Sequence, residues 1–267
     1  AGANSGVVTF EVHPEALTAG KAPGLITGSA DRERLLRDKF HMDTVVTLPF
    51  DDHMRAMPWQ DFLEMLERDQ NAAGFVCGSD FRFGAKGSGT AKKLAAFCES
   101  RQLSCSVVPQ QLLEDIRVSS TYIRTLIAQG EIERANEFLG HPYTLSDRVS
   151  HGKKLGTTLG FPTVNLKLKE HVLPPAKGVY ATKVILENGE THIAVTNVGT
   201  RPTVDDGDHL TIEGFILDFN GDLYGQKIQM EFFKYLRPEK KFPSFDALKE
   251  EVFRNAQQTR DYFAENP

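Results

Sequence analysis

The sequence lacks any apolar run of the roughly 18–20 residues that a membrane-spanning helix needs. Near its start it shows no basic stretch followed by an apolar one, the pattern of a secretory signal peptide. Basic charge is also scarce: 31 Lys and Arg stand against 36 Asp and Glu, for a net charge of -5. Without a basic field, a nucleic acid polymer is not expected as a partner. We therefore expect a chain that binds neither a membrane nor a polynucleotide.

Cysteine is scarce as well. Cys77, Cys98 and Cys105 form no CxxC motif, and three thiols cannot all pair within one chain. This usage favours a reducing, cytoplasmic compartment in which thiols serve as small apolar side chains. No histidine stands at metal-ligand spacing from another histidine or a cysteine, which argues against zinc. The GxSxG elbow and the Walker A motif are missing too.

The first half alternates strand-like and helix-like stretches, an order typical of a parallel sheet covered by helices. The 267 residues, 40% hydrophobic and 25% charged, suffice for one large domain or two ordinary ones. Helical spacing is clear around Phe62 and Leu94, and a helix capped by Ser119 ends at Gly130. The predicted strands are 7–10, 44–48, 75–78 and 104–108.

The second half has a different pattern, with strand after strand and no helix between them. Such an order predicts an antiparallel barrel or sandwich. A final helix begins at Ser244 and carries an apolar stripe. We therefore expect two domains, residues 1–140 and 141–267. The strands predicted here are 145–149, 178–185, 192–198, 210–217 and 227–233.

Residues 151–165 contain three glycines and two adjacent lysines followed by a strand, a composition able to fold over phosphates. Thr163 and Asn165 are two residues apart, so on a strand both side chains point to one face. A hydroxyl and an amide oxygen are hard donors suited to Mg²⁺ that also touches substrate phosphates. An ordinary glycine-rich turn into a strand explains the same residues without a ligand.

Glu213 lies in a predicted strand on the same face as Phe215 and Leu217. A carboxylate among apolar residues costs free energy unless it is paired or functional. It could accept the proton of an attacking hydroxyl. On an edge strand, however, it would be an ordinary solvated glutamate.

Several weaker signals lie in the first half. Hydroxyls and N–H groups at a helix N-terminus form an anion site, although simple capping by Ser119 explains that segment equally. A nucleotide could lie just past the first strand, although a lone His there is more often structural. The residues concerned are Ser119, Ser120, Thr121 and Arg124 at the helix, His13 and Pro14 past the first strand, and Asp80, Phe81 and Arg82 after the third.

Together these segments resemble the bacterial bifunctional riboflavin kinase/FMN adenylyltransferase family, also called FAD synthetase. The resemblance runs over nearly the whole chain, with eight markers in the family's order. They are 9–10 with 13–14 (TF, HP), 78–84 (GSDFRFG), 119–121 with Arg124 (SST), 140–143 (GHPY), 160–165 (GFPTVN), 178–180 (GVY), 197–203 (NVGTRPT) and 222–225 (DLYG).

The resemblance implies a C-terminal six-stranded antiparallel barrel with a C-terminal helix, a domain that phosphorylates riboflavin with ATP. Thr163 and Asn165 would match the family's metal- and ATP-binding pair, with Mg²⁺ as the metal, and Glu213 its catalytic base. Flavin binding is assigned to Gly199, Arg201 and Arg237. The residues assigned to ATP are Gly152, Lys153, Lys154, Gly156, Thr157, Pro162, Thr163 and Asn165.

The N-terminal half would be a nucleotidyltransferase-like α/β domain that transfers AMP from ATP to FMN. Phosphate would be bound by Ser119, Ser120, Thr121 and Arg124. The nucleotide or FMN would be bound by residues 13–14 and 80–82. The family's G-x-F-D-G-x-H-x-G-H motif should come well before Thr9 and is missing, so we expect that the true beginning is not included. As given, the chain should be a weak adenylyltransferase. Thr157 also replaces the family's usual Arg.

Two other hypotheses remain open. A kinase-only enzyme with a remnant N-terminal domain would make FMN and no FAD. A flavin- or nucleotide-binding regulator would bind FMN tightly without turning over ATP. Thr163, Asn165 and Glu213, all present, speak against the regulator.

Overall fold

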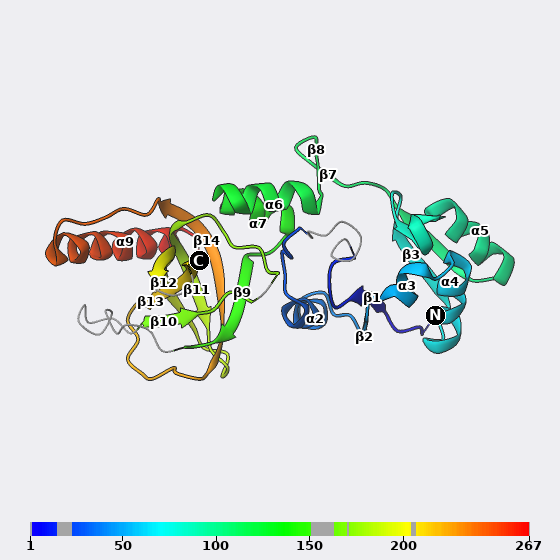
Figure 1. Ribbon diagram of the computed structural model, residues 1–267, viewed down its shortest axis with the longest axis horizontal. Coiled ribbons are helices and arrows are strands. Elements are labelled where there is room, and N and C mark those ends of the chain that lie inside the picture. Colours follow the sequence, from blue (N-terminus) through cyan, green and yellow to red (C-terminus); the bar gives the residue numbers. More distant parts are fainter. Residues whose placement is uncertain (1, 15–22, 151–162, 170, 204–206, 267) are drawn as a thin grey trace. The chain divides into compact units, whose positions relative to one another are not determined.

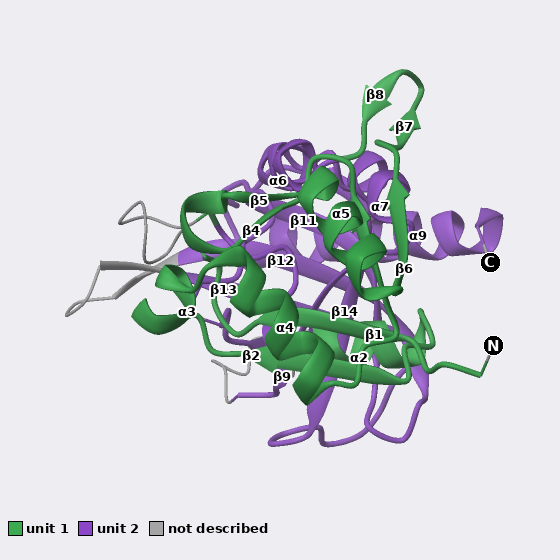
Figure 2. Cartoon of the chain, turned by 90° about the vertical axis from the view of Figure 1, so that its right-hand side faces the viewer, with its two compact units in different colours: residues 1–23, 32–118 green, residues 24–31, 119–267 purple. Residues whose placement is uncertain are grey.

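The computed structural model describes residues 2–14, 23–150, 163–169, 171–203 and 207–266 (Figure 1). The ATP-binding residues expected between 151 and 162 lie outside this range. Two compact units divide the chain: unit 1 comprises residues 1–23 and 32–118, and unit 2 comprises residues 24–31 and 119–267 (Figure 2).

Unit 1 contains two parallel strand pairs. β1 (Gly6–Phe10) pairs with β2 (Thr44–Leu48), and β3 (Gly74–Gly78) pairs with β6 (Ser104–Val108). All four strands were predicted within one residue of their bounds. Sequence patterns are too short to predict the two small antiparallel pairs, β4 (Arg82–Phe83) with β5 (Gly89–Thr90) and β7 (Leu112–Leu113) with β8 (Ile116–Arg117).

Two helices of unit 1 bury the apolar faces that their spacing predicts. Phe62, Leu63 and Leu66 of α4 (Trp59–Asp69) are buried together with Leu94 and Cys98 of α5 (Ala91–Arg101). α3 (Asp52–Ala56) is a single short turn. α2 (Ser29–Asp38) begins in unit 2 and continues in unit 1.

Two helices open the second part of unit 2, as their capping residues predict. Ser119 accepts a hydrogen bond from the N–H of Tyr122 at the start of α6 (Ser120–Gln129), and α7 (Ile132–Leu139) follows. Gly130 and Gly140 end the two helices with φ of 83° and 71°, values that glycine adopts without steric cost. By their contacts residues 119–140 therefore group with the strands that follow them.

A curved six-stranded antiparallel sheet forms the body of unit 2, in the order β10-β13-β12-β11-β14-β9. Its edge strands meet at one point, where the N–H of Ser150 donates to the carbonyl of Asn165 at 2.9 Å. The strands are β9 (Tyr143–Arg148), β10 (Thr163–Leu166), β11 (Gly178–Ile185), β12 (Thr191–Thr203), β13 (Gly207–Ile216) and β14 (Lys227–Arg237). This confirms the predicted fold class.

The two faces of this sheet are buried differently. The concave interior is filled by large side chains with almost no exposure: Tyr180, Phe232, Ile212, Met230 and Val164. The outer face is covered in part by α9 (Phe245–Glu265), capped by Ser244 as predicted. Figure 1 shows α9 in red lying along β11 and β12, where Val179 and Val195 pack on Ala256.

Residues 24–31 belong to unit 2 although they precede most of unit 1. Leu25 forms a parallel bridge with Val172, and its N–H donates to the carbonyl of His171 at 2.7 Å. Arg124 Nε donates to the carbonyl of Gly24 at 2.8 Å. Sequence patterns gave no sign of this segment, because its partners are distant in the chain.

No helix in the described part of the chain is both long and apolar enough to cross a membrane.

Candidate active site

Three polar side chains form a row across neighbouring strands on the outer face of the unit 2 sheet. Asn165 of β10 pairs with Glu213 of β13, and Glu213 pairs with Asn197 of β12. Directly opposite residues of antiparallel strands point to the same face, with Cβ atoms about 5 Å apart. The base predicted from the sequence is therefore flanked by an amide on each side.

Thr163 shares this face with Asn165, because side chains alternate along β10. Val164, between the two, and Leu166, which follows Asn165, are buried in the sheet interior, whereas Thr163 and Asn165 are half-buried. The backbone carbonyl of Asn165 accepts from Ser150, which fixes this end of the strand. A hydroxyl and an amide oxygen presented side by side fit a divalent cation that also touches phosphate.

Glu213 is half-buried, and its Oε1 atom is shielded from solvent. The alternation that places it outside places Ile212 and Gly214 of the same strand inside. Because β13 lies between β10 and β12, the edge-strand alternative, a freely solvated glutamate, does not hold.

A second carboxylate lies beside the row. Asn197 Nδ2 donates to Glu239 Oε1 at 3.5 Å, and Glu239 comes from the connection between β14 and α9. A Cβ atom placed on Gly199 would lie 2.0 Å from the same oxygen. Neither Asn197 nor Glu239 was predicted as a site residue, although Asn197 begins the 197–203 marker and Glu239 lies two residues after Arg237.

Arg237, expected to bind flavin, ends β14 and is held from α9. Its Nε lies 3.1 Å from Asn255 Oδ1 and 3.2 Å from Glu251 Oε1. Lys240 and Arg254 also pair with Glu251, whose side chain is 8% exposed. Burial lowers the pKa of Arg237, and the hydrogen bond from Lys240, joined by the nearby cations, lowers that of Glu251.

Part of the expected kinase site lies outside the described residues. This applies to Gly152, Lys153, Lys154, Gly156, Thr157 and Pro162. Arg201 is described only as a backbone position of β12, opposite His209. The strand predicted to end at Val198 continues to Thr203, because its pairing with β13 continues.

The expected adenylyltransferase residues of unit 1 follow the ends of two parallel strands. His13 and Pro14 come shortly after β1, and residues 80–82 follow β3. Asp80 is ion-paired with Arg117. Phe81 is 43% exposed and stacks on Phe83 with ring centroids 5.3 Å apart. Arg82 is exposed in β4.

The expected phosphate-binding residues lie at the N-terminus of α6 in unit 2. Ser119 caps the helix, Ser120 and Thr121 form its first turn, and Arg124 lies one turn further on. The side chain of Arg124 is held by the carbonyl of Gly24. The capping role assigned to Ser119 from the sequence is confirmed.

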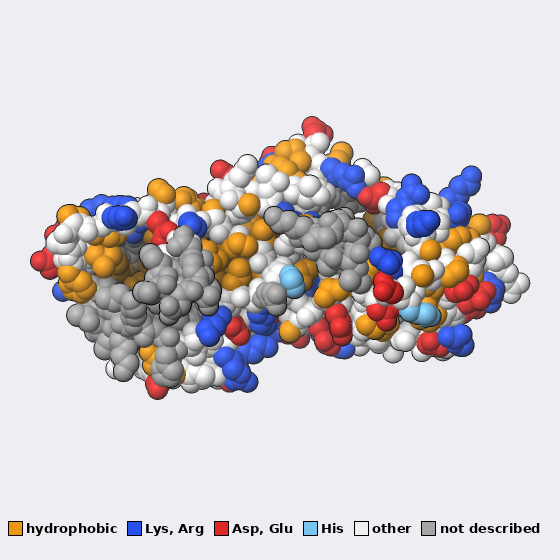
Figure 3. All heavy atoms as spheres, viewed as in Figure 1, with side chains coloured by type: hydrophobic (Ala, Val, Ile, Leu, Met, Phe, Trp, Pro, Cys, Tyr) orange, Lys and Arg blue, Asp and Glu red, His pale blue; other side chains and the backbone are white. Residues whose placement is uncertain are grey.

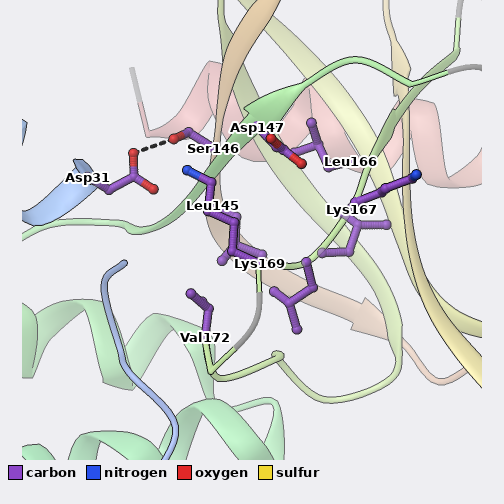
Figure 4. Close-up of a pocket in the computed structure, with 10 residues that line it drawn as sticks. Asp31, Leu145, Ser146, Asp147, Leu166, Lys167, Lys169 and Val172 are labelled. Atoms are coloured by element: carbon purple, nitrogen blue, oxygen red, sulfur yellow. Dashed lines mark hydrogen bonds between the residues drawn. The ribbon is translucent and has the colours of Figure 1, made fainter. Parts of the chain in front are cut away.

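A small pocket in unit 2 lies apart from this polar row (Figure 4). Its wall includes Leu166 and Ile212, which face the sheet interior, and Ser146, which donates to the carboxylate of Asp31. Side-chain alternation places Asn165 and Glu213 on the opposite face. The pocket is therefore separate from the candidate active site.

The molecular surface carries mixed charge. On the face shown in Figure 3, acidic and basic side chains are interspersed, as the net charge of -5 leads one to expect. Among the described residues, no three His, Cys, Asp or Glu side chains are grouped so as to hold a metal ion. Thr163 and Asn165 offer a hydroxyl and an amide oxygen, which are neutral oxygen ligands outside that set.

Family models match both halves of the chain. A riboflavin kinase model matches residues 139–263, and an FAD synthetase model matches residues 1–122. A crystal structure of a Streptococcus pneumoniae protein named macrolide-efflux protein has a TM-score of 0.84 and 30% identity, covering 96% of this chain and 83% of that one.

Curated relatives agree with the two models. The bifunctional riboflavin kinase/FMN adenylyltransferase of Listeria monocytogenes is 34% identical over 265 residues, which cover 98% of this chain and 83% of that protein. The protein of the same name from Haemophilus influenzae is 35% identical over 266 residues, covering 96% and 83%. The resemblance inferred from eight short motifs is thus confirmed, and the chain belongs to the bifunctional riboflavin kinase/FMN adenylyltransferase family.

Proposed function

We propose that this chain phosphorylates riboflavin with ATP and then transfers AMP from a second ATP to the FMN product. The row of Asn165, Glu213 and Asn197, with Thr163 on the same face, carries the kinase half of this proposal. It presents one carboxylate between neutral oxygen and nitrogen donors. That is the set of groups needed to accept a proton beside a metal-bound phosphate.

In the kinase reaction Glu213 acts as the general base. It takes the proton of the terminal ribityl hydroxyl, whose oxygen forms a bond to the γ-phosphorus of ATP. The bond from that phosphorus to the bridging oxygen breaks, and ADP leaves. Positioning and charge neutralisation supply most of the rate enhancement in phosphoryl transfer.

Thr163 and Asn165 would hold the divalent metal, which we propose to be Mg²⁺ and which would supply neutralisation of the charge on the phosphates of ATP. We assign Gly152, Lys153, Lys154, Gly156, Thr157 and Pro162 to the same nucleotide, and Gly199, Arg201 and Arg237 to the flavin. The neutral hard donors of β10 support this choice of ion.

For the adenylyltransferase reaction we assign ATP phosphates to Ser119, Ser120, Thr121 and Arg124. The free N–H groups at a helix N-terminus attract anions, which supports this assignment. His13, Pro14, Asp80, Phe81 and Arg82 are assigned to nucleotide or FMN. Their places after β1 and β3 support this, since ligands of parallel sheets bind at the carboxyl ends of strands.

We further propose a cytoplasmic enzyme with small-molecule partners only: riboflavin, FMN and ATP. Three free cysteines among the described residues support a reducing compartment. The functional division proposed from the sequence is 1–140 for adenylyl transfer and 141–267 for the kinase.

The direct test is to incubate the chain with riboflavin, ATP and Mg²⁺ and to separate riboflavin, FMN and FAD by chromatography. FMN is the expected main product, with a smaller amount of FAD. FMN alone would support the kinase half and contradict adenylyl transfer by this chain. Bound riboflavin without FMN would overturn the kinase assignment and favour a regulator.

A further inference from the structure

The connection between β14 and α9, residues 238–243, is anchored on one side by a buried carboxylate. Arg237 just before it and Lys240 within it both pair with Glu251 of α9, at 3.2 and 2.6 Å. Breaking such a buried ion pair is costly, because it leaves charge without compensation. The anchor therefore fixes the course of the residues between these two cations.

Glu239 lies between the two anchored cations and points the other way, toward β12. Its Oε1 lies 3.5 Å from Asn197 Nδ2. A Cβ atom on Gly199 would overlap this oxygen at 2.0 Å. The carboxylate occupies space that any residue other than glycine would need for its own side chain.

This position brings Glu239 close to the reacting group of the proposed kinase. Asn197 contacts Glu239 and is the direct cross-strand partner of Glu213. The two carboxylates thus lie on either side of a single amide. A carboxylate can accept about four hydrogen bonds. Glu239 is exposed, so its carboxylate can accept further hydrogen bonds besides the one from Asn197.

When the terminal hydroxyl of a substrate reaches Glu213, the rest of the substrate's chain must lie close to Asn197 and Glu239. In riboflavin that chain is a polyol with several hydroxyl donors. Hydrogen bonds to a charged acceptor are about twice as strong as neutral ones. Glu239 matches such a chain better than it would match an alkyl chain.

We propose that Glu239 is a specificity-determining residue of the kinase reaction, accepting hydrogen bonds from the inner hydroxyls of the substrate's polyol chain. Gly199 provides the space that Glu239 needs, and Glu251 positions the segment that carries it. The inference rests on the proposed riboflavin kinase activity and adds a polyol-recognising group to its site.

The test compares riboflavin with an analogue that keeps the terminal hydroxyl and lacks the inner ones. For each we would measure kcat and KM, and the dissociation constant by quenching of flavin fluorescence. We expect Glu239→Gln to lower the preference for riboflavin roughly ten- to hundred-fold, the range for a hydrogen bond to a charged group. The KM for ATP should not change.

Gly199→Ala perturbs the same carboxylate without removing it. It should lower the preference for riboflavin in the wild-type background and have little further effect in Glu239→Ala. Such non-additivity identifies residues that act together. Glu250→Gln, which removes an exposed carboxylate from α9, is the matched control and should behave as wild type. Thermal unfolding of each variant separates loss of fold from loss of recognition.

Wild-type discrimination in Glu239→Gln, or full additivity of the Gly199 and Glu239 changes, would overturn the inference. Absence of FMN from the wild-type reaction would overturn the proposed kinase instead. In that case the binding measurements still decide the role of Glu239, because they need no turnover. A wild-type chain that binds neither flavin would overturn both.

Discussion

Asn165 of β10 lies directly opposite Glu213 of β13, so that a predicted metal donor and a predicted base are cross-strand neighbours. They are 48 residues apart in the sequence numbering, and only strand pairing brings them together. A base one strand away from a proposed metal donor would be suitably placed to act on the attacking hydroxyl.

Glu213→Gln keeps the shape of the side chain and removes its basicity. We expect kcat for FMN formation to fall by about 100-fold or more, the usual contribution of a general base. The KM for riboflavin should change little, because the amide retains an acceptor. Steady-state kinetics with riboflavin and ATP measure both, and near-normal turnover would refute the base assignment.

Thr163→Val and Asn165→Leu remove the two proposed metal donors and keep similar volume. We expect each variant to need at least several-fold more Mg²⁺ for half-maximal kinase rate, because fewer oxygen ligands remain. A magnesium titration at fixed ATP measures this. Thr191→Val, at the first residue of β12, makes the same chemical change away from these donors and is the matched control. An unchanged magnesium requirement in both variants would contradict the metal assignment.

Glu251 should make stability depend on pH. Its pKa lies below the ordinary value of 4.5, first because of the hydrogen bond from Lys240 and also because of Arg254 and Arg237. A carboxyl with a lowered folded-state pKa contributes stability above its ordinary pKa and loses it as pH falls through the lowered one. Wild type should therefore lose stability below about pH 4.5 more steeply than Glu251→Gln.

Denaturant unfolding from pH 7 down to pH 3 would measure this difference. Near neutral pH, Glu251→Gln should be less stable by about 1–3 kcal/mol, because three cations lose their charged partner. Parallel curves for the two proteins across the acid range would contradict the assignment.

Ser146→Ala should destabilise unit 2. Ser146 and Asp31 are each 5% exposed, and the serine hydroxyl donates to the carboxylate. Removing a donor from a buried carboxylate costs about 1–3 kcal/mol. Thermal unfolding measures the loss, with Ser100→Ala in unit 1 as a control for serine removal elsewhere. Equal stability of wild type and Ser146→Ala would show that the contact does not matter.

The three cysteines should differ in reactivity. Cys105 is exposed, whereas Cys98 is fully buried and burial, helped by Cys105, raises its pKa to about 11. Since the thiolate is the reactive form, a soluble aromatic disulfide reagent should modify Cys105 first. Cys98 and Cys77 should react only on unfolding. Fast modification that persists in Cys105→Ser would contradict this order.

Local patterns were sufficient for the longer strands, for several helix ends and for part of the site. Alternation placed Thr163 and Asn165 on one face, and Ser119, Gly130 and Ser244 marked helix ends where the structure has them. These signals are local because capping and side-chain alternation involve residues close in sequence. The domain boundary proposed at 140/141 and the binding roles remain predictions.

The sequence by itself determined the family and the α/β and β halves, and it supplied the proposal for the groups that do the chemistry. The tertiary structure decided that β13 lies between β10 and β12, that Glu213 is not on an edge, and that residues 24–31 join unit 2. It also brought Glu239 over Gly199. Strand order and such close approaches arise from pairing between distant segments, which no local pattern specifies.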